Sequence, residues 1–360
     1  MARKYNFYAG PSTLPFEVLK ELEKDLVDYQ GSGLSLVETS HRSKEYDEVH
    51  FSVINGIKSL LDVPDDYEVL LLGGGATLQF SMIPQNLLGD KSSVDFVVSG
   101  TWAKKALADA KLYAEANVLW DGKDGAYTSL PSPADLKPNA ESAYLHITSN
   151  ETINGVQWKD FPESDIPVVA DMSSDILSRP LPVDRFGLIY AGAQKNLAPA
   201  GVTMVIIRKD MINRAPEKLG AYLKYKTHAD KDSLYNTPPV FPIWAMSKVL
   251  KWIEGKGGLE GIQELNSRKA SLLYGVIDNT DGFYNCPVDK DVRSHMNVVF
   301  TLKNEELQDE FLKGASQRDM LGLKGHRSVG GCRASIYNAM PLEGVQALAD
   351  YMKEFAKKNG

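Results

Sequence analysis

A lysine and an aspartate each stand at the end of an apolar run, where a parallel sheet would gather its chemistry. Asp171 closes the run 168–170, and Lys195 follows the run 188–191 in a short loop. The carboxyl ends of parallel strands form the crevice in which α/β proteins bind ligands. A carboxylate in that crevice needs a cationic partner, and a lysine between two buried strands is unusual. Taken singly, the two residues also fit a helix cap and a solvated loop lysine.

An aldehyde cofactor with a pyridine ring would explain both residues. Lys195 would form a Schiff base with the aldehyde and then act as the general base of the reaction. Asp171 would keep the ring nitrogen protonated, so that the ring can accept carbanion electrons. The separation of 24 residues fits two neighbouring strands. The pair therefore favours a pyridoxal-phosphate site.

A glycine-rich segment after another apolar run is suited to hold a phosphate. Glycines 73–75 follow the run 69–72 and precede Ala76, Thr77 and a helix that we expect to begin near Leu78. Glycines allow close backbone approach, and a helix N-terminus offers free N–H groups. A dinucleotide fingerprint would need glycine at position 78, and a P-loop would need Gly-Lys-Ser/Thr, so both patterns are missing. A tight turn without a ligand stays open for this segment alone.

Two more residues follow strand-like runs and would complete such a site. Trp102 follows the run 94–99, and its ring is suited to stack on a pyridine for about 1 kcal/mol beyond area burial. Thr152 follows the run 143–148 and has a hydroxyl for the ring oxygen. Core packing is the alternative for Trp102, and helix capping is the alternative for Thr152.

An α/β core must bring these residues together. Apolar runs closed by Gly, Ser, Thr or Asp alternate with amphipathic stretches, which predicts a mostly parallel sheet covered by helices on both faces. The predicted strands are 68–72, 94–99, 143–148, 167–171, 188–191 and 202–207. We expect the catalytic residues at their carboxyl ends.

A change of pattern after Pro242 predicts a smaller second α/β domain. A helix over 243–254 ends at 255–258, Gly-Lys-Gly-Gly, which combines a stop signal with a hinge. We expect helices at 260–277, 305–318 and 342–357 and strands at 297–302 and 334–338 beyond it. The predicted division is an N-terminal segment 1–15 near the active site and small domain, a large domain 16–258 and a small domain 259–360.

The composition narrows the class of protein. Of 360 residues, 43% are hydrophobic and 24% charged, which is ordinary globular usage. A net charge of -7 argues against a nucleic-acid surface, and no apolar stretch is long enough to cross a membrane. The start at Met1 lacks a signal-peptide core, and Cys286 and Cys332 predict no disulfide framework. We expect a cytoplasmic protein without a metal site, because the histidines lack ligand spacing.

A few basic residues stand out in this acidic chain and suit a dianionic substrate. Arginine binds carboxylate and phosphate groups bidentately, and a hydrogen bond to a charged group contributes about 1.5 to 3 kcal/mol. The candidates are His41, Arg42, His326, Arg327 and Arg333.

From end to end the chain resembles the phosphoserine aminotransferases, a family of class-V pyridoxal-phosphate enzymes with the aspartate-aminotransferase-like fold. The most specific motifs are 6–11 (NFYAGP), 40–43 (SHRS), 190–196 (YAGAQKN) and 325–339 (GHRSVGGCRASIYNA). The resemblance implies a large, mostly parallel-sheet domain and a smaller C-terminal α/β domain. It also implies a homodimer with shared active sites.

The resemblance implies a role for each candidate residue. Lys195 would hold the cofactor, Asp171 would pair with the ring nitrogen, and Trp102 would stack on the ring. The remaining cofactor contacts would be Thr152 to the ring oxygen, Ala76, Thr77 and Gln194 to the phosphate, and Asn236 and Thr237 to the phosphate of the other subunit. Arg333 would bind the substrate α-carboxylate, and the group His41, Arg42, His326 and Arg327 would bind the far phosphate.

The implied reaction belongs to serine biosynthesis. It is the reversible transfer of an amino group from L-glutamate to 3-phosphohydroxypyruvate, which gives O-phospho-L-serine and 2-oxoglutarate. Some family members also use 4-phosphohydroxythreonine, in pyridoxine biosynthesis. One alternative is a related enzyme, either an alanine–glyoxylate-type aminotransferase or a cysteine desulfurase, although neither cysteine lies in a long flexible loop. A nucleotide-binding regulator is the alternative from another class.

Overall fold

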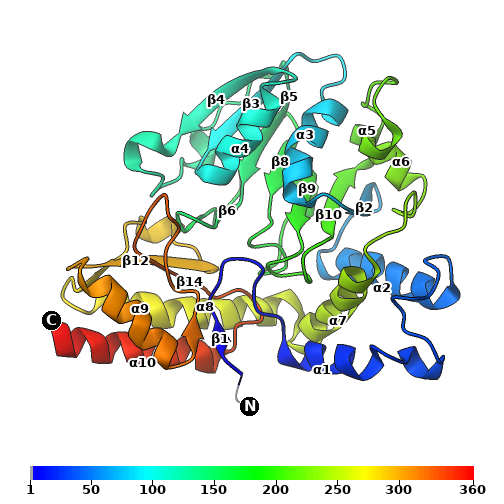
Figure 1. Ribbon diagram of the computed structural model, residues 1–360. Helices are drawn as coiled ribbons and strands as arrows, with labels where there is room; N and C mark the ends of the chain where they lie inside the picture. The colour runs from blue at the N-terminus through cyan, green and yellow to red at the C-terminus, as the bar shows by residue number, and fades with distance from the viewer. Residues whose placement is uncertain (1–2) are drawn as a thin grey trace.

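A seven-stranded sheet forms the centre of the molecule, which was obtained as a computed structural model that describes residues 3–360 (Figure 1). Its strands are, in spatial order, β2 (Tyr67–Leu72), β10 (Thr203–Arg208), β9 (Phe186–Gly192), β8 (Val168–Asp171), β5 (Ser142–Thr148), β3 (Ser93–Val98) and β4 (Glu115–Asp121). Only β10 runs against its neighbours. The predicted mostly parallel sheet is confirmed, and the six predicted strands are found within two residues of their expected ends.

The strand β4 was not predicted, because it lies at the edge of the sheet. Its side chains are partly exposed, and Glu115, Asn117 and Asp121 interrupt its apolar character. An edge strand pairs on one side only and needs no continuous apolar run.

Helices cover both faces of the sheet and bury alternate side chains of each strand. Val69 and Leu71 of β2 belong to one core, whereas Leu70 and Leu72 belong to the other. Successive side chains of a strand point to opposite faces, so a strand that is buried on both sides is apolar throughout. The first core is closed by α1 (Phe16–Asp25), α2 (Lys44–Leu60) and α7 (Val240–Gly255), and the second by α3 (Gly75–Leu87), α4 (Thr101–Ala110) and α6 (Tyr225–Ala229).

A separate core forms in the C-terminal part of the chain around a small antiparallel sheet (Figure 1). This part contains α8 (Gly258–Asp278), β11 (Tyr284–Asn285), β12 (Asn297–Leu302), α9 (Leu307–Gln317), β13 (Met320–Leu321), β14 (Cys332–Ser335) and α10 (Leu342–Asn359). The helix α8 connects the two parts, since Ile262 packs in the first core of the large sheet and Leu273 packs in the C-terminal core. Of the segment 255–258 that we expected between the two helices, only Lys256 and Gly257 lie outside α7 and α8.

The strand predicted at 334–338 is wrong in position, because β14 ends at Ser335. Beyond it, the carbonyl groups of Ile336, Tyr337 and Asn338 accept hydrogen bonds from Lys269 Nζ at 2.8, 2.6 and 3.3 Å. Lys269 is completely buried, so its ammonium group must find partners inside the protein. The chain turns toward that cation instead of continuing in the sheet.

The N-terminal segment crosses from the C-terminal core to the large sheet. Its strand β1 (Tyr5–Asn6) pairs with β13, and the Ser12 N–H donates to Gln194 O at 2.9 Å. Tyr337 donates its hydroxyl to Ala9 O at 2.7 Å. Met1 and Ala2, which we assigned to the same segment, lie outside the described residues.

Three further short elements lie outside the main sheet. They are β6 (Asn150–Glu151), β7 (Val156–Gln157) and α5 (Lys209–Ile212). Among residues 3–360, none of the helices combines the length and the apolar character that a membrane crossing requires.

Candidate active site

A cavity of about 120 Å³ lies at the carboxyl ends of the central strands. It is lined by Gly75, Ala76, Thr77, Trp102, Thr148, Asn150, Thr152, Asp171, Ser173, Ser174, Gln194 and Lys195. The cavity therefore brings together the residues that we predicted around the cofactor ring and one side of its phosphate. The position at the strand ends is the one that the parallel sheet requires.

Lys195 reaches the cavity from the loop after β9. Its Nζ donates a hydrogen bond to Thr152 Oγ1 at 2.6 Å and lies 5.5 Å from the centroid of the Trp102 ring. Burial lowers the pKa of Lys195 to about 8, although the negative charges of Asp171 and Glu151 partly oppose this. A lysine with such a pKa is roughly one-tenth neutral at pH 7, far more than an ordinary lysine, and its neutral form can act as a nucleophile and a base.

Asp171 ends β8 and points into the same cavity. Its Oδ1 accepts a hydrogen bond from the Ser173 N–H at 2.9 Å. Burial raises the pKa of Asp171, although the Ser173 hydrogen bonds and the charge of Lys195 oppose the rise. A cationic ring nitrogen held against this carboxylate would favour its ionised form.

The N-terminus of α3 lines the cavity through Gly75, Ala76 and Thr77. The preceding Gly74 has φ 89° and caps the helix without a side-chain hydrogen bond. A Cβ atom on Gly74 would overlap Leu78. The helix thus begins three residues earlier than its expected start at residue 78, and its first turn offers backbone N–H groups to an anion.

Several buried polar atoms at the site have no partner among the described residues. Thr148 Oγ1 and Trp102 Nε1 belong to the cavity wall, and Arg333 Nε lies next to it. Buried polar groups usually have partners, so these atoms point to a ligand. An amine, a buried carboxylate, a flat ring and a phosphate cradle around one cavity fit pyridoxal phosphate.

A comparison with known proteins identifies the family. The sequence model of the family described as "Aminotransferase class-V" matches residues 4–348. The chain belongs to the class-V aminotransferase family. It is therefore a pyridoxal-phosphate-dependent transaminase, and the alternative of a nucleotide-binding regulator is wrong.

Curated relatives that match this class-V aminotransferase along its whole length are named phosphoserine aminotransferase. The phosphoserine aminotransferase of Geobacillus kaustophilus is 52% identical over 99% of each chain, and that of Bacillus subtilis is 49% identical over 100% of each chain. The solved phosphoserine aminotransferase from Bacillus circulans subsp. alkalophilus has a TM-score of 0.98 at 49% identity and covers 99% of each chain. A pyridoxal-phosphate-bound phosphoserine aminotransferase from Trichomonas vaginalis has a TM-score of 0.92 at 37% identity, covering 98% of this chain and 100% of its own.

More distant aminotransferases share only the fold. The alanine–glyoxylate aminotransferase from Nostoc sp. has a TM-score of 0.77 at 14% identity, covering 98% of this chain and 95% of its own. The predicted aspartate-aminotransferase-like architecture is confirmed.

A second cavity of about 210 Å³ lies between the large-sheet side of this class-V aminotransferase and its C-terminal part. His326 and Arg333 line it, together with Ile153 and Asn154 from the large sheet side. Arg333 donates from a terminal nitrogen to Thr152 O at 3.3 Å, so it adjoins both cavities. Burial, followed by the positive charges of Arg333, Arg327 and Lys105, lowers the pKa of His326, so Arg333 is the cationic side chain in a lining that is otherwise mostly apolar.

The remaining predicted residues of the aminotransferase do not line either cavity within the described chain. Arg42 is exposed ahead of α2, and His41 is half-buried beside it. Asn236 and Thr237 are exposed, and Asn236 Nδ2 donates to Thr237 O at 3.0 Å. Arg327 is exposed as well. The predicted residues that lie outside both cavities are therefore His41, Arg42, Asn236, Thr237 and Arg327.

Glu151 is a site residue that the sequence analysis missed. It is completely buried, and its carboxylate accepts hydrogen bonds from the N–H groups of Trp102 at 3.2 Å and Ala103 at 3.0 Å. An acidic residue directly before Thr152, just beyond a predicted strand, was the available signal. The same signal, polar residues beyond a strand end, would have found Thr148, Asn150, Ser173 and Ser174.

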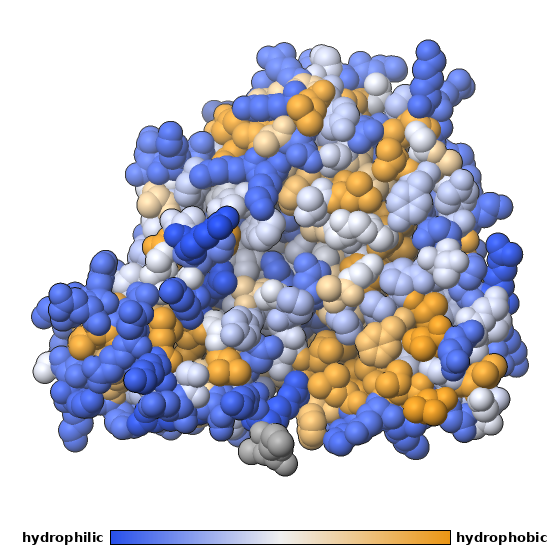
Figure 2. All heavy atoms as spheres, viewed as in Figure 1, coloured by the Kyte–Doolittle hydropathy of each residue, from blue (hydrophilic) through white to orange (hydrophobic). Residues whose placement is uncertain are grey.

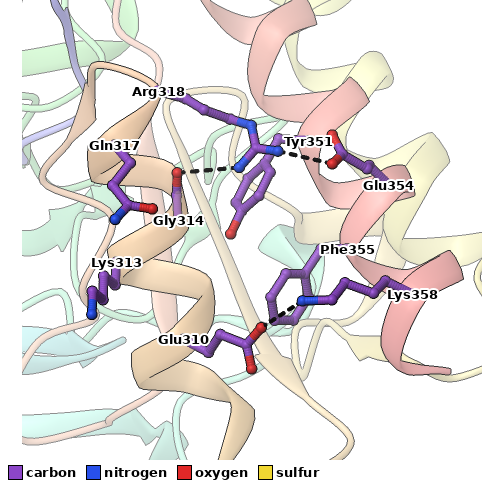
Figure 3. Close-up of a pocket in the computed structure, with 9 residues that line it drawn as sticks. All are labelled: Glu310, Lys313, Gly314, Gln317, Arg318, Tyr351, Glu354, Phe355 and Lys358. Carbon is purple, nitrogen blue, oxygen red and sulfur yellow. Dashed lines mark hydrogen bonds and ion pairs between the residues drawn. The ribbon is translucent and has the colours of Figure 1, made fainter.

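A larger hollow of about 330 Å³ between α9 and α10 offers no comparable chemistry (Figure 3). Four of its charged side chains pair with one another, Arg318 with Glu354 at 2.8 Å and Lys358 with Glu310 at 3.0 Å. Figure 3 shows Arg318 lying across the Tyr351 ring as it reaches Glu354. These side chains are largely solvated, so the hollow is part of the ordinary surface.

Proposed function

We propose that this transaminase moves an amino group reversibly between L-glutamate and 3-phosphohydroxypyruvate, giving O-phospho-L-serine and 2-oxoglutarate. The relatives near 50% identity over the whole chain are phosphoserine aminotransferases. The observation that carries the proposal is the pairing of two cavities. One contains Lys195 and Asp171, and the other contains Arg333 and His326, which supports a substrate that extends from the lysine toward the C-terminal part of the chain.

Bound pyridoxal phosphate supplies an electron sink for the carbanion that forms when an amino acid loses its Cα proton. Lys195 Nζ is the group that carries the aldehyde between reactions and moves the Cα proton during them. Thr152 holds that nitrogen in place by its 2.6 Å hydrogen bond. Asp171 would hold the ring nitrogen by its negative charge, and Trp102 would supply a flat apolar wall for the ring.

The phosphate of the cofactor is assigned to the N-terminus of α3. Ala76 and Thr77 offer first-turn N–H groups, and Gln194 lines the same cavity. No acidic side chain lies in the first turn of α3, so its positive end is not neutralised locally.

The cationic residues are assigned to the substrate. Arg333 binds the α-carboxylate, because it adjoins the Lys195 cavity through Thr152 O. The group His41, Arg42, His326 and Arg327 binds the far phosphate of one substrate and the side-chain carboxylate of glutamate. The same pocket then serves both halves of the reaction.

We propose a homodimer in which Asn236 and Thr237 reach the cofactor phosphate of the other subunit. Both residues are exposed and lie in neither cavity of their own chain. Exposed apolar side chains near the N-terminus support an interface, and they include Phe16, Leu26, Val27, Leu34, Val37 and Phe51. Figure 2 shows apolar atoms gathered over the lower right of the molecule, where Figure 1 places α1 and α7. A monomeric soluble protein rarely exposes a wide apolar area.

Sedimentation of two matched variants tests the dimer. Val27→Asp puts a charge on the proposed interface at a side chain that is 82% exposed. Leu112→Asp is the control, at a leucine that is 75% exposed after α4. We expect Val27→Asp to shift the protein toward monomer at a given concentration and the control to leave it unchanged. A monomeric unaltered protein would contradict the proposal.

A substrate comparison tests the reaction itself. Glutamate is supplied with 3-phosphohydroxypyruvate or with its unphosphorylated analogue in a coupled assay. Two or more hydrogen bonds to a charged phosphate, at about 1.5 to 3 kcal/mol each, predict a preference of at least 100-fold in kcat/KM, at about 1.4 kcal/mol for each tenfold. Equal activity on both would refute the phosphate assignment.

Two narrower assignments belong to the same proposal. The pocket also accepts 4-phosphohydroxythreonine, the substrate of pyridoxine biosynthesis, since that molecule offers the same phosphate and α-carboxylate. The free cysteines Cys286 and Cys332 support a cytoplasmic location, because reducing compartments keep thiols unpaired. Assaying that substrate and fractionating cells test these two assignments.

A further inference from the structure

Glu151 caps a helix to which it does not belong. It lies in β6, 49 residues from Trp102, and its two carboxylate oxygens accept the N–H groups of Trp102 and Ala103 in the first turn of α4. The residue at the N-cap of α4 is Gly100, which makes no side-chain cap, and the first turn contains no acidic residue. A buried carboxylate from another segment therefore satisfies these N–H groups and faces the positive end of the helix.

Gly100 leaves the space that this carboxylate occupies. A Cβ atom at position 100 would lie 2.7 Å from Glu151 Oε2 and 2.9 Å from Glu151 Cγ, closer than real contacts allow. The φ of Gly100 is 167°, an extended value that any residue adopts, so conformation does not require glycine there. Glycine is needed at position 100 only because a side chain there would occupy the space of the Glu151 carboxylate.

The capped turn carries the aromatic wall of the active site. The Trp102 ring lies 5.5 Å from Lys195 Nζ, while Thr152, directly after Glu151, accepts the hydrogen bond of that same nitrogen. Glu151 therefore holds the backbone of the turn that carries the Trp102 ring, and the next residue, Thr152, holds the lysine. A displacement of this dipeptide would move both walls of the cavity.

We propose that Glu151 is a positioning residue of the transaminase, which fixes the Trp102 turn of α4 against the Lys195 side of the cofactor cavity. The proposal rests on the assignment of Trp102 and Lys195 to the cofactor and not on the identity of the substrate. It differs from a general structural role, because it predicts effects on the ring and on the lysine together.

The charge of Glu151 adds a second effect on Lys195. The charged groups that act on this carboxylate are Asp171 and Lys195, and Arg333 acts on the lysine in turn. Burial raises the pKa of Glu151 itself to about 7, so the carboxylate is mostly ionised only above that pH. There its negative charge, together with those of Asp171 and Asp175, raises the pKa of Lys195 against the larger effect of burial. Removing that charge should therefore lower the pKa of Lys195.

Four variants separate position from charge. Glu151→Gln keeps the size but removes the charge, and its amide nitrogen cannot accept one of the two backbone N–H groups. Glu151→Asp keeps the charge on a shorter side chain. Gly100→Ala keeps every charge but displaces the carboxylate. Glu141→Gln is the matched control, at an exposed glutamate that pairs with Lys91 at 2.8 Å.

The first measurement uses the cofactor-free protein. The near-ultraviolet circular dichroism of Trp102 is obtained by subtracting the spectrum of Trp102→Phe in each background. We expect both Glu151→Gln and Gly100→Ala to change this difference spectrum, and the control to leave it unchanged. At a pH well above 8, where Lys195 is neutral in every variant, the affinity for pyridoxal phosphate should fall in Glu151→Gln and in Gly100→Ala, because each variant displaces the turn that carries Trp102.

The second measurement follows the pH dependence of pyridoxal-phosphate uptake, which reports the neutral fraction of Lys195. Glu151→Gln should move the midpoint to lower pH, whereas Glu151→Asp should leave it near that of the unaltered protein. A purely structural role would change stability without this midpoint shift. The thermal unfolding of each variant shows whether it is folded.

The proposal is wrong if Glu151→Gln matches Glu141→Gln in the Trp102 spectrum, the cofactor affinity and the uptake midpoint. If Glu151→Gln does not fold, Glu151→Asp and Gly100→Ala decide the question, and unchanged spectra in both would overturn it. The proposed reaction is refuted by a different result, namely that the unaltered protein does not prefer phosphorylated substrates. The spectrum, the cofactor affinity and the uptake midpoint are measured without substrate, so the two failures are distinguishable.

Discussion

Thr152→Val should make Lys195 a weaker base without changing the shape of the cavity. Valine and threonine have nearly the same volume, so the substitution removes chiefly the hydroxyl that accepts the 2.6 Å hydrogen bond from Lys195 Nζ. That hydrogen bond favours the protonated lysine. Its loss therefore adds to the effect of burial, which already lowers the pKa of Lys195 to about 8.

The size of the effect follows from the strength of a charged hydrogen bond. A loss of about 1.5 to 3 kcal/mol from the protonated form corresponds to a fall of about one to two pH units in the titration midpoint. At pH 7 a lysine with a pKa of about 8 is roughly one-tenth neutral. A midpoint lower by one pH unit makes it roughly half neutral, about a fivefold increase in reactive amine.

The assay is the rate at which cofactor-free protein takes up pyridoxal phosphate, followed by absorbance across a pH range on both sides of 8. Thr203→Val is the matched control, since its hydroxyl is also buried without a hydrogen-bond partner among the described residues but does not line the cavity. We expect the midpoint to move to lower pH in Thr152→Val alone. An unchanged midpoint in Thr152→Val, or an equal shift in the control, would refute the reasoning.

Three further substitutions test other parts of the structure. Lys195→Ala should abolish steady-state turnover with glutamate, and retained turnover would disprove the assignment of the lysine. Gly74→Ala should weaken pyridoxal-phosphate binding about tenfold or more, measured by titration, because φ 89° and the overlap with Leu78 both disfavour a side chain. Lys269→Met should lower the free energy of unfolding by about 3 kcal/mol or more in urea denaturation, because it leaves buried carbonyl groups without a hydrogen-bond donor. A loss below about 1 kcal/mol would contradict this.

The main sheet was predictable because its strands are buried on both faces. A strand such as β9 must then be apolar throughout and end sharply at a polar loop, so its residues mark both the strand and the place of Lys195. The edge strand β4 lacks this constraint and was missed. The strand expected at 334–338 was misplaced because the cation that draws its carbonyl groups away, Lys269, comes from a distant helix.

The sequence by itself indicated the residues to which the chemistry is assigned. Lys195, Asp171 and the glycines before α3 each stand at a strand end, and a parallel sheet gathers such positions at one edge whatever the details of packing. Their types and order were therefore enough to indicate a pyridoxal-phosphate site, whereas the family was indicated by the resemblance of motifs such as 190–196 and 325–339.

Only the tertiary structure decided how those residues are held. The hydrogen bond of Thr152 to Lys195 and the fit of Glu151 into the space left by Gly100 join segments that are 43 and about 50 residues apart. Local sequence patterns report which face of an element is buried, but they do not report which distant side chain lies against it. Contacts between segments depend on the packing of the whole sheet, and the function of Glu151 became visible only there.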